Sequence, residues 1–177
     1  MTANHSRIIA LISAIVAAAA LRLIPHPPNF SPIGAMALFS GAYIGRRAMA
    51  FAAPIAALLL SDVVLGFYHG MATVYSATAL IVLIGWFALG RVSPVRVGMA
   101  AVASSVLFFV ITNFGMWLLS GFYPPTFAGF EACYLAAIPF FQNTLAGDLF
   151  YSALLFGGFR IAETLAPSLR AEGPVTA

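Results

Sequence analysis

Charge is what this 177-residue sequence lacks most, since Asp, Glu, Lys and Arg together make up 7% of it against 62% hydrophobic residues. Lysine is absent, and all basic residues are arginine. The chain has too little polar surface to cover a water-soluble globule. We therefore expect a lipid bilayer to surround it. The length suits a single membrane domain over residues 1–166, followed by a disordered cytoplasmic tail over residues 167–177.

Other absences exclude whole classes of site. A single cysteine, Cys133, excludes an internal disulfide and a multi-cysteine metal site. His69 has neither a second histidine four residues away nor a neighbouring cysteine, so it is not expected to bind a metal. The arginines are scattered, unlike those of a nucleic-acid-binding surface, and no cofactor or catalytic motif occurs in a supporting context. We therefore expect no enzyme, cofactor, metal or nucleic-acid partner.

Long apolar stretches, separated by prolines, glycines and arginines, predict six transmembrane helices. They are expected over residues 8–23, 33–44, 48–67, 73–89, 97–119 and 141–161. Residues 120–139 contain prolines, glycines and aromatic residues, and we expect a long connection that lies at the membrane interface or dips into the protein. We interpret the first stretch as a retained helix, because more membrane helix rather than an exported domain follows it.

Six crossings place both termini on the same side of the membrane. Cytoplasmic segments of membrane proteins carry an excess of arginine. With the N-terminus inside, only Arg22 falls at the outer face, and every other arginine falls at or near the cytoplasmic face. We therefore predict a multi-pass protein of the bacterial inner membrane with both termini in the cytoplasm.

Polar side chains near the apolar stretches gather towards the predicted outer face, whereas the inner halves hold mainly apolar residues. Polar groups are costly in hydrocarbon, so a one-sided set predicts a substrate-binding pocket open to the outside. A proton or ion pathway would need polar groups across the full thickness. The predicted substrate-binding residues are Arg22, Asn29, Asp62, Tyr75, Asn113, Trp117, Asn143 and Asp148.

Each of these residues also has a structural interpretation. Asn113 and Asn143 could join helices by hydrogen bonds, and Arg22 and Asp62 could form an ion pair at a hydrated helix end. Asp148 is the most informative, because it lies deepest and has no basic residue near it in its own helix. Its partner is expected to be Arg22, a hydroxyl group, a bound ligand or a proton.

The aromatic residues between positions 117 and 134 are typical of a belt at the membrane interface. For Trp117 and Tyr123, a lid that closes over a flat ligand is the alternative. On the first helix, Ala10, Ala14 and Ala18 recur every four residues, a spacing that lets helix backbones approach closely. That face fits packing within the protein and docking onto another membrane protein equally well.

Six helices, both ends inside, an alanine-faced first helix and an outward-facing pocket resemble the S-components of energy-coupling-factor (ECF) transporters. The resemblance implies uptake of a vitamin or cofactor precursor, with a coupling subunit at the alanine face and ATPases as further partners. The segments Asn29–Gly34, Thr112–Gly115 and Asn143–Asp148 are also similar to a family of small bacterial membrane proteins described only as candidate transport proteins.

Among S-components, the solitary cobalamin transporters of the BtuM type are similar in size. They are also similar in a set of one asparagine, one aspartate and one tyrosine, which matches Asn29, Asp62 and Tyr75. Some of them carry a cysteine after the aspartate that contacts cobalt. This sequence departs from that pattern, since Cys133 lies far downstream. Cobalamin is thus one candidate substrate, without cysteine-dependent chemistry. The alternative function is a structural membrane scaffold that binds no ligand.

Overall fold

The computed structural model describes residues 5–45 and 47–170, and every regular element in this part of the chain is a helix. The predicted all-α class with six α-helices is confirmed. Two short 3-10 helices, η1 and η2, accompany them. The elements are α1 (His5–Ala20), η1 (Leu21–Leu23), α2 (Ile33–Tyr43), α3 (Arg47–Leu65), α4 (Met71–Ala88), α5 (Pro94–Leu119), α6 (Phe127–Leu165) and η2 (Pro167–Leu169).

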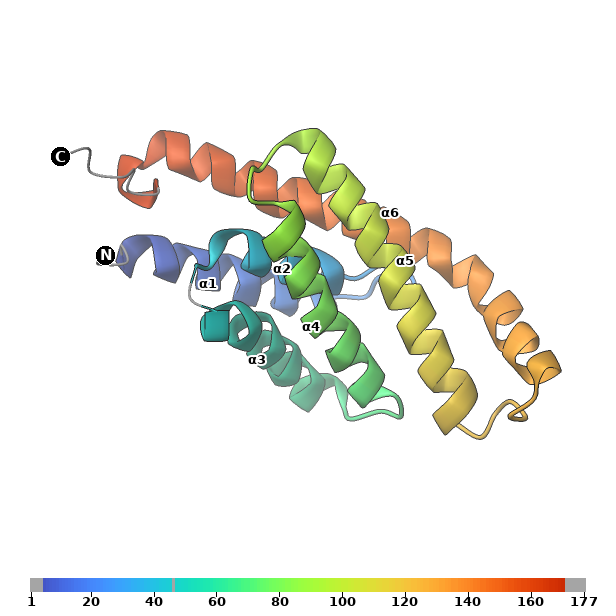
Figure 1. Cartoon of the computed structure of the whole chain (residues 1–177). Coiled ribbons are helices and arrows are strands. Elements are labelled where there is room, and N and C mark those ends of the chain that lie inside the picture. The colour runs from blue at the N-terminus through green and yellow to red at the C-terminus, as the bar shows by residue number, and fades with distance from the viewer. Residues whose placement is uncertain (1–4, 46, 171–177) are drawn as a thin grey trace.

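Five of these helices are long and apolar enough to cross a membrane, and α2 is the exception. Its 11 residues extend about 16 Å at the usual helical rise, roughly half of a bilayer's hydrocarbon core. Residues 33–41 are all buried, and α2 contacts each of the other five α-helices. α2 is therefore the central helix of the bundle (Figure 1), where protein rather than lipid surrounds it.

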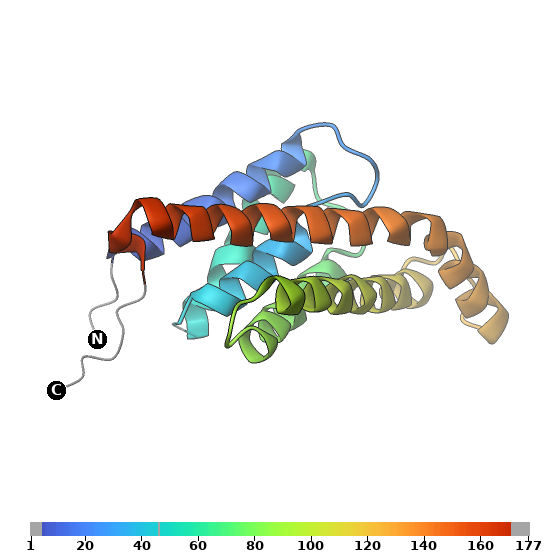
Figure 2. The ribbon, with the colours of Figure 1, turned by 90° about the horizontal axis from the view of Figure 1, so that it is seen from above.

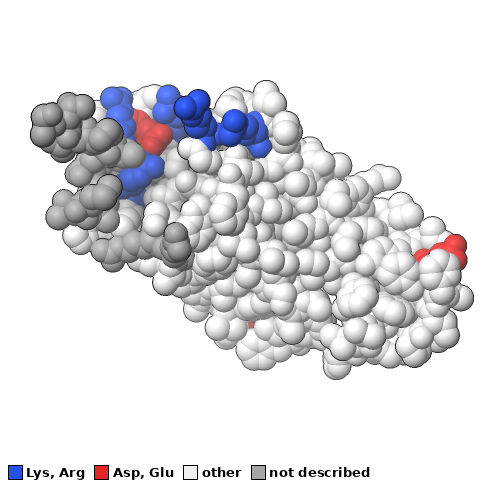
Figure 3. Space-filling model, viewed as in Figure 1, with Lys and Arg blue, Asp and Glu red and all other residues white. Residues whose placement is uncertain are grey.

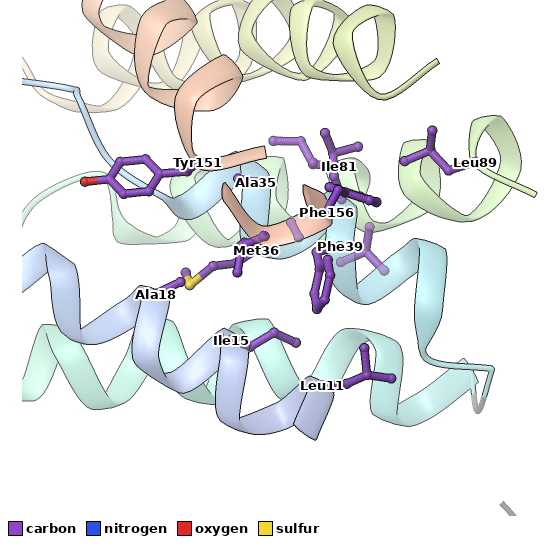
Figure 4. Close-up of a cluster of buried hydrophobic side chains, with 14 of the residues drawn as sticks. Leu11, Ile15, Ala18, Ala35, Met36, Phe39, Ile81, Leu89, Tyr151 and Phe156 are labelled. Atoms are coloured by element: carbon purple, nitrogen blue, oxygen red, sulfur yellow. The ribbon is translucent and has the colours of Figure 1, made fainter. Parts of the chain in front are cut away.

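Aromatic and aliphatic side chains around α2 form the core (Figure 4). The ring of Phe39 meets the rings of Phe156 and Phe159 edge to face, at centroid distances of 5.3 and 5.5 Å. Leu11 and Ile15 approach from α1 on the other side of Phe39. Such close packing is what holds helices together in lipid, where burial of apolar surface gives little driving force. The middle of α2 is thus fixed between α1 and α6.

Two glycines let α2 cross α4 at very short range. A Cβ atom on Gly41 would lie 2.1 Å from the carbonyl oxygen of Val82, and one on Gly85 would lie 2.4 Å from that of Leu38. Backbone atoms cannot move aside as the end of a flexible side chain can. Glycine is therefore required at both positions, as at other close helix contacts in membranes.

The largest departure from the sequence-based prediction is the start of α6. We expected residues 120–139 to form an irregular connection, but the helix begins at Phe127 and runs through Pro139 without interruption. Thr126 caps it, since its Oγ1 accepts a hydrogen bond from the backbone N–H of Gly129 at 3.2 Å. Proline removes one helical hydrogen bond, and membrane helices tolerate it with a bend. The ribbon of α6 accordingly bends in its first third (Figure 2).

The N- and C-terminal helices meet at one end of the bundle, which we call the arginine end. Its arginines with described side chains are Arg7, Arg91, Arg96, Arg160 and Arg170. Figure 3 shows the blue of arginine side chains gathered at this end. Arg7 forms a 2.6 Å ion pair with Glu163 and donates a hydrogen bond to the carbonyl of Leu169. Of the predicted disordered tail, residues 167–169 form η2, and residues 171–177 lie outside the described residues.

Candidate functional site

A cavity of about 700 Å³ lies at the opposite end of the bundle from the arginine end. Its walls come from η1 and the connector that follows it, the start of α2, the α3–α4 turn, the second half of α5 and the middle of α6. We call it the pocket. Its volume falls within the range of sites that bind small molecules.

The pocket exists because α2 begins late. Pro25, Pro27 and Pro28 prevent the connector between η1 and α2 from forming a helix. The connector turns at Asn29, whose φ of 64° lies in the left-handed region that asparagine tolerates better than most residues. A full-length helix in this position would fill the space. A shortened, proline-interrupted helix is also how several transporters open a binding site in the middle of the membrane.

Asp148 lies on the pocket wall and is 3% exposed. Its Oδ2 accepts a 2.7 Å hydrogen bond from the hydroxyl of Ser105 on α5. Its carboxylate also packs against Gly34, where a Cβ atom would lie 2.3 Å from Oδ1. Of the four partners that the sequence allowed, the structure shows the hydroxyl group. In the last helix expected over residues 141–161, Asp148 would lie near the start; this position was wrong, since α6 begins at Phe127 and Asp148 lies near its middle.

Three other predicted site residues also line the pocket, namely Arg22, Asn29 and Asn113. The Nδ2 of Asn113 donates a 2.7 Å hydrogen bond to the carbonyl of Phe109, one turn earlier in α5. This bond uses one of its two amide protons and leaves its carbonyl oxygen as an acceptor. Asn113 can therefore orient a ligand that carries a hydrogen-bond donor.

Asp62 does not line the pocket but lies behind its wall, fully buried. Its Oδ1 is 2.8 Å from Nη2 of Arg22, an ion pair whose angle lies outside hydrogen-bond geometry. Its Oδ2 accepts a 2.9 Å hydrogen bond from the hydroxyl of Tyr75. The structural ion pair that the sequence left open is thus confirmed. It ties η1 to α3 and α4, and Tyr75 belongs to this cluster rather than to the pocket lining.

Asn143 and Trp117 also lie outside the pocket lining. Asn143 donates a 2.9 Å hydrogen bond from Nδ2 to the carbonyl of Pro28, which fastens the connector to α6. Trp117 donates from Nε1 to the carbonyl of Pro124 at 3.1 Å, and its ring meets that of Phe130 at 5.4 Å. Both side chains make contacts between elements of the fold rather than lining the pocket. The lid over a flat ligand therefore finds no support in the position of Trp117.

Tyr68 and His69, in the turn between α3 and α4, line the pocket. Burial raises the pKa of the Tyr68 hydroxyl, and the negative charge of Asp62 raises it further, so this group stays a neutral phenol near neutral pH. Cys133 is buried away from the pocket, with its Sγ 3.5 Å from the carbonyl oxygen of Asn113. Over residues 5–45 and 47–170, the structure brings no three His, Cys, Asp or Glu residues together as a metal site.

Several pocket residues were not predicted from the sequence. Phe108, Phe109 and Phe140 supply aromatic rings, and Thr112 and Thr144 supply hydroxyl groups. The threonines lie one turn from Phe108 and Phe140, whose carbonyls accept their hydrogen bonds. The spacing of one helical turn between each threonine and its phenylalanine could have predicted a shared face on α5 and α6. An apolar membrane helix, however, has many pairs of residues at this spacing.

The alanine face of α1 points into the protein. Ala18 is buried in the core, and Ala10 and Ala14 are packed against it. Of the two interpretations that the spacing allowed, the structure favours packing within the protein. The side of α1 that is exposed carries larger residues, with Ile9 and Val16 among them.

Comparisons with known proteins give the chain a family but no activity. No curated protein matches the chain, and no solved structure matches it. Residues 2–169 match DUF6580, which is described as a family of unknown function. Because this match covers nearly the whole sequence, the chain belongs to the DUF6580 family.

Proposed function

We propose that this protein binds a small solute in the pocket and takes part in its uptake across the bacterial inner membrane, as an S-component does. The observation that carries the proposal is the cavity of about 700 Å³ left by the short α2. A scaffold gains nothing from such a hollow, because unfilled space forfeits packing contacts. A vitamin or cofactor precursor is of a size that fits it.

The direction of uptake follows from the arginines. Arg22 lies at the pocket end, and every other arginine with a described side chain lies at the arginine end. Cytoplasmic ends carry the excess of arginine in membrane proteins. In our proposal, the arginine end therefore faces the cytoplasm, and the pocket receives solute from outside.

Cysteine labelling tests this orientation. In a Cys133→Ser background, we expect Phe122→Cys, in the α5–α6 loop, to react with a membrane-impermeant maleimide in spheroplasts. Val92→Cys, in the α4–α5 loop, should react only after the cells are opened. Both positions are exposed in the structure, so accessibility from each side decides the result. Labelling of Val92→Cys in intact spheroplasts would reverse the orientation.

An S-component delivers its solute with a coupling subunit and ATPases, and these are the partners that the proposal implies. A scaffold without a ligand remains the second candidate, and the hydrogen bond from Asn143 and the Arg22–Asp62 pair favour it, because both join elements of the fold. The two functions differ in one respect, since only the first requires the pocket to be occupied.

Filling the pocket separates the two functions. Thr112 lines the pocket, so Thr112→Trp should block it, whereas Val106→Trp adds the same side chain to an exposed position on the same helix. We expect native mass spectrometry of wild-type protein in nanodiscs to detect a bound solute. The amount of bound solute should fall at least tenfold in Thr112→Trp and should stay at the wild-type level in Val106→Trp. A wild-type pocket that stays empty after purification and after screening with vitamins would favour the scaffold.

A further inference from the structure

We propose that the pocket selects solutes that carry a cationic nitrogen beside a flat ring, with the cation bound at Asp148. This inference rests on the proposed function and adds the chemical class of the solute. It follows from the charges that line the pocket, from the depth of Asp148 and from the aromatic rings that share the pocket with it.

The first step is the charge of the pocket. Of the arginine, aspartate and glutamate residues, two line the pocket, namely Arg22 and Asp148. The charge of Arg22 is balanced by Asp62, which lies 2.8 Å away and is fully buried behind the wall. Asp148 has no such partner, since no described basic side chain forms an ion pair with it. When Asp148 is ionised, its carboxylate is therefore the one unpaired charge among the Arg, Asp and Glu side chains of the lining.

The second step concerns what can balance this charge. A buried carboxylate is costly unless it is hydrogen-bonded and paired. Ser105 supplies one hydrogen bond to Asp148, and the first turn of α2, at Gly34, places the partially positive end of a helix beside it. Both favour a negative charge at this point without balancing it fully. A cationic group on the solute would complete the pair, and an anionic group would be repelled.

The third step concerns the aromatic rings that share the pocket with Asp148. Ala137, Phe140, Thr144 and Asp148 lie on one face of α6, and all four line the pocket. Asp148 is the member of this row nearest to the arginine end, because α6 runs towards that end. Phe140 of α6 and Phe108 and Phe109 of α5 line the same pocket, so a solute bound at Asp148 shares the pocket with aromatic rings. Aromatic rings attract cations as well as other flat groups.

Matched sets of small molecules that differ in charge test the inference directly. Phenethylamine, 2-phenylethanol and phenylacetate share one ring, and tryptamine, tryptophol and indole-3-acetate share a larger one. In each set the first is cationic, the second neutral and the third anionic at neutral pH. Binding to wild-type protein in nanodiscs would be measured by equilibrium dialysis. We expect the amine of at least one set to bind at least tenfold more tightly than the alcohol, and the carboxylate to bind most weakly.

Asp148→Asn keeps the size of the side chain and removes its charge. The ratio of the affinity for the amine to that for the alcohol, which we call the preference for the amine, should therefore fall to near one. The matched control is Glu131→Gln, an exposed carboxylate on the same helix, which should leave the preference unchanged. Thermal unfolding of each variant in nanodiscs shows that it is folded. Retention of the preference in Asp148→Asn, equal binding of amine and alcohol, or failure of both amines to bind would overturn the inference.

The test distinguishes this inference from the proposed function. If amines and alcohols bind equally well and Thr112→Trp abolishes both, the pocket binds solutes but not by charge. If the probes bind equally to wild type and Thr112→Trp, they do not occupy the pocket, and the inference fails. The proposed function is then decided by its own measurement, the solute that co-purifies with the protein.

Discussion

Gly41→Ala and Gly85→Ala should each leave little folded protein, although each adds only one methyl group. The added Cβ would lie 2.1 Å from the carbonyl oxygen of Val82 in the first case and 2.4 Å from that of Leu38 in the second. Relief requires α2 and α4 to move apart, and α2 is held by every other α-helix. Overpacking of a dense core costs about 1–3 kcal/mol, and a clash with backbone belongs at the upper end of that range or above it.

The matched control for this prediction is Gly158→Ala on α6, where an added Cβ would meet no atom within 4 Å. Glycine within a helix is less favourable than alanine by roughly 0.5–1 kcal/mol, so this variant should be as stable as wild type or slightly more so. The yield of monodisperse protein on size-exclusion chromatography and the melting temperature in detergent would be measured for all three. Equal melting temperatures for Gly85→Ala and Gly158→Ala would show that α2 and α4 do not cross so closely.

The second large effect is expected when the pair behind the pocket wall is broken on one side. Arg22→Met leaves Asp62 fully buried without its cation, and loss of one partner of a buried pair costs about 3–5 kcal/mol. Asp62→Leu should cost less, because the Arg22 side chain keeps 9% exposure and two other acceptors, the Ser61 hydroxyl and the Leu58 carbonyl. The free energy of unfolding would be measured in detergent for both variants.

The double variant Arg22→Met/Asp62→Leu is the decisive member of this series. It removes both charges together, so it should recover much of the stability that Arg22→Met loses. Tyr75→Phe removes only the hydrogen bond to Asp62 and should cost about 1 kcal/mol. If the effects of the two charge substitutions simply add, the two residues do not interact, and the ion pair contributes nothing to the fold.

The sequence predicted the helices best where prolines and arginines separate apolar stretches. α2 was expected over residues 33–44 and is found at Ile33–Tyr43, because Pro32 and Arg46 bracket it. The expectation that a helix ends at a proline was wrong at Pro139, which lies inside α6. Whether a proline ends or bends a helix depends on the neighbours packed around it, and a single sequence does not show them.

The candidate site was predictable only in part. A one-sided set of polar residues pointed to the end of the bundle at which the cavity lies, and Asp148 in that set lines the cavity. The sequence suggested a pair between Arg22 and Asp62 and marked Asp148 as lacking a basic neighbour in its own helix, but it did not show which of the two carboxylates faces the cavity. Ser105 was missed for a similar reason, since a serine in a membrane helix usually bonds to its own backbone. Here it does so to Ala101 and also reaches Asp148.

The shortness of α2 has a consequence for how the chain is made. A segment of 11 residues has too little apolar length to enter a bilayer as an independent span, which takes about 20. It must be carried in between its longer neighbours α1 and α3. The partners that cover it include α6, which is synthesised after the other five α-helices, so the centre of the bundle is not enclosed until α6 has been made.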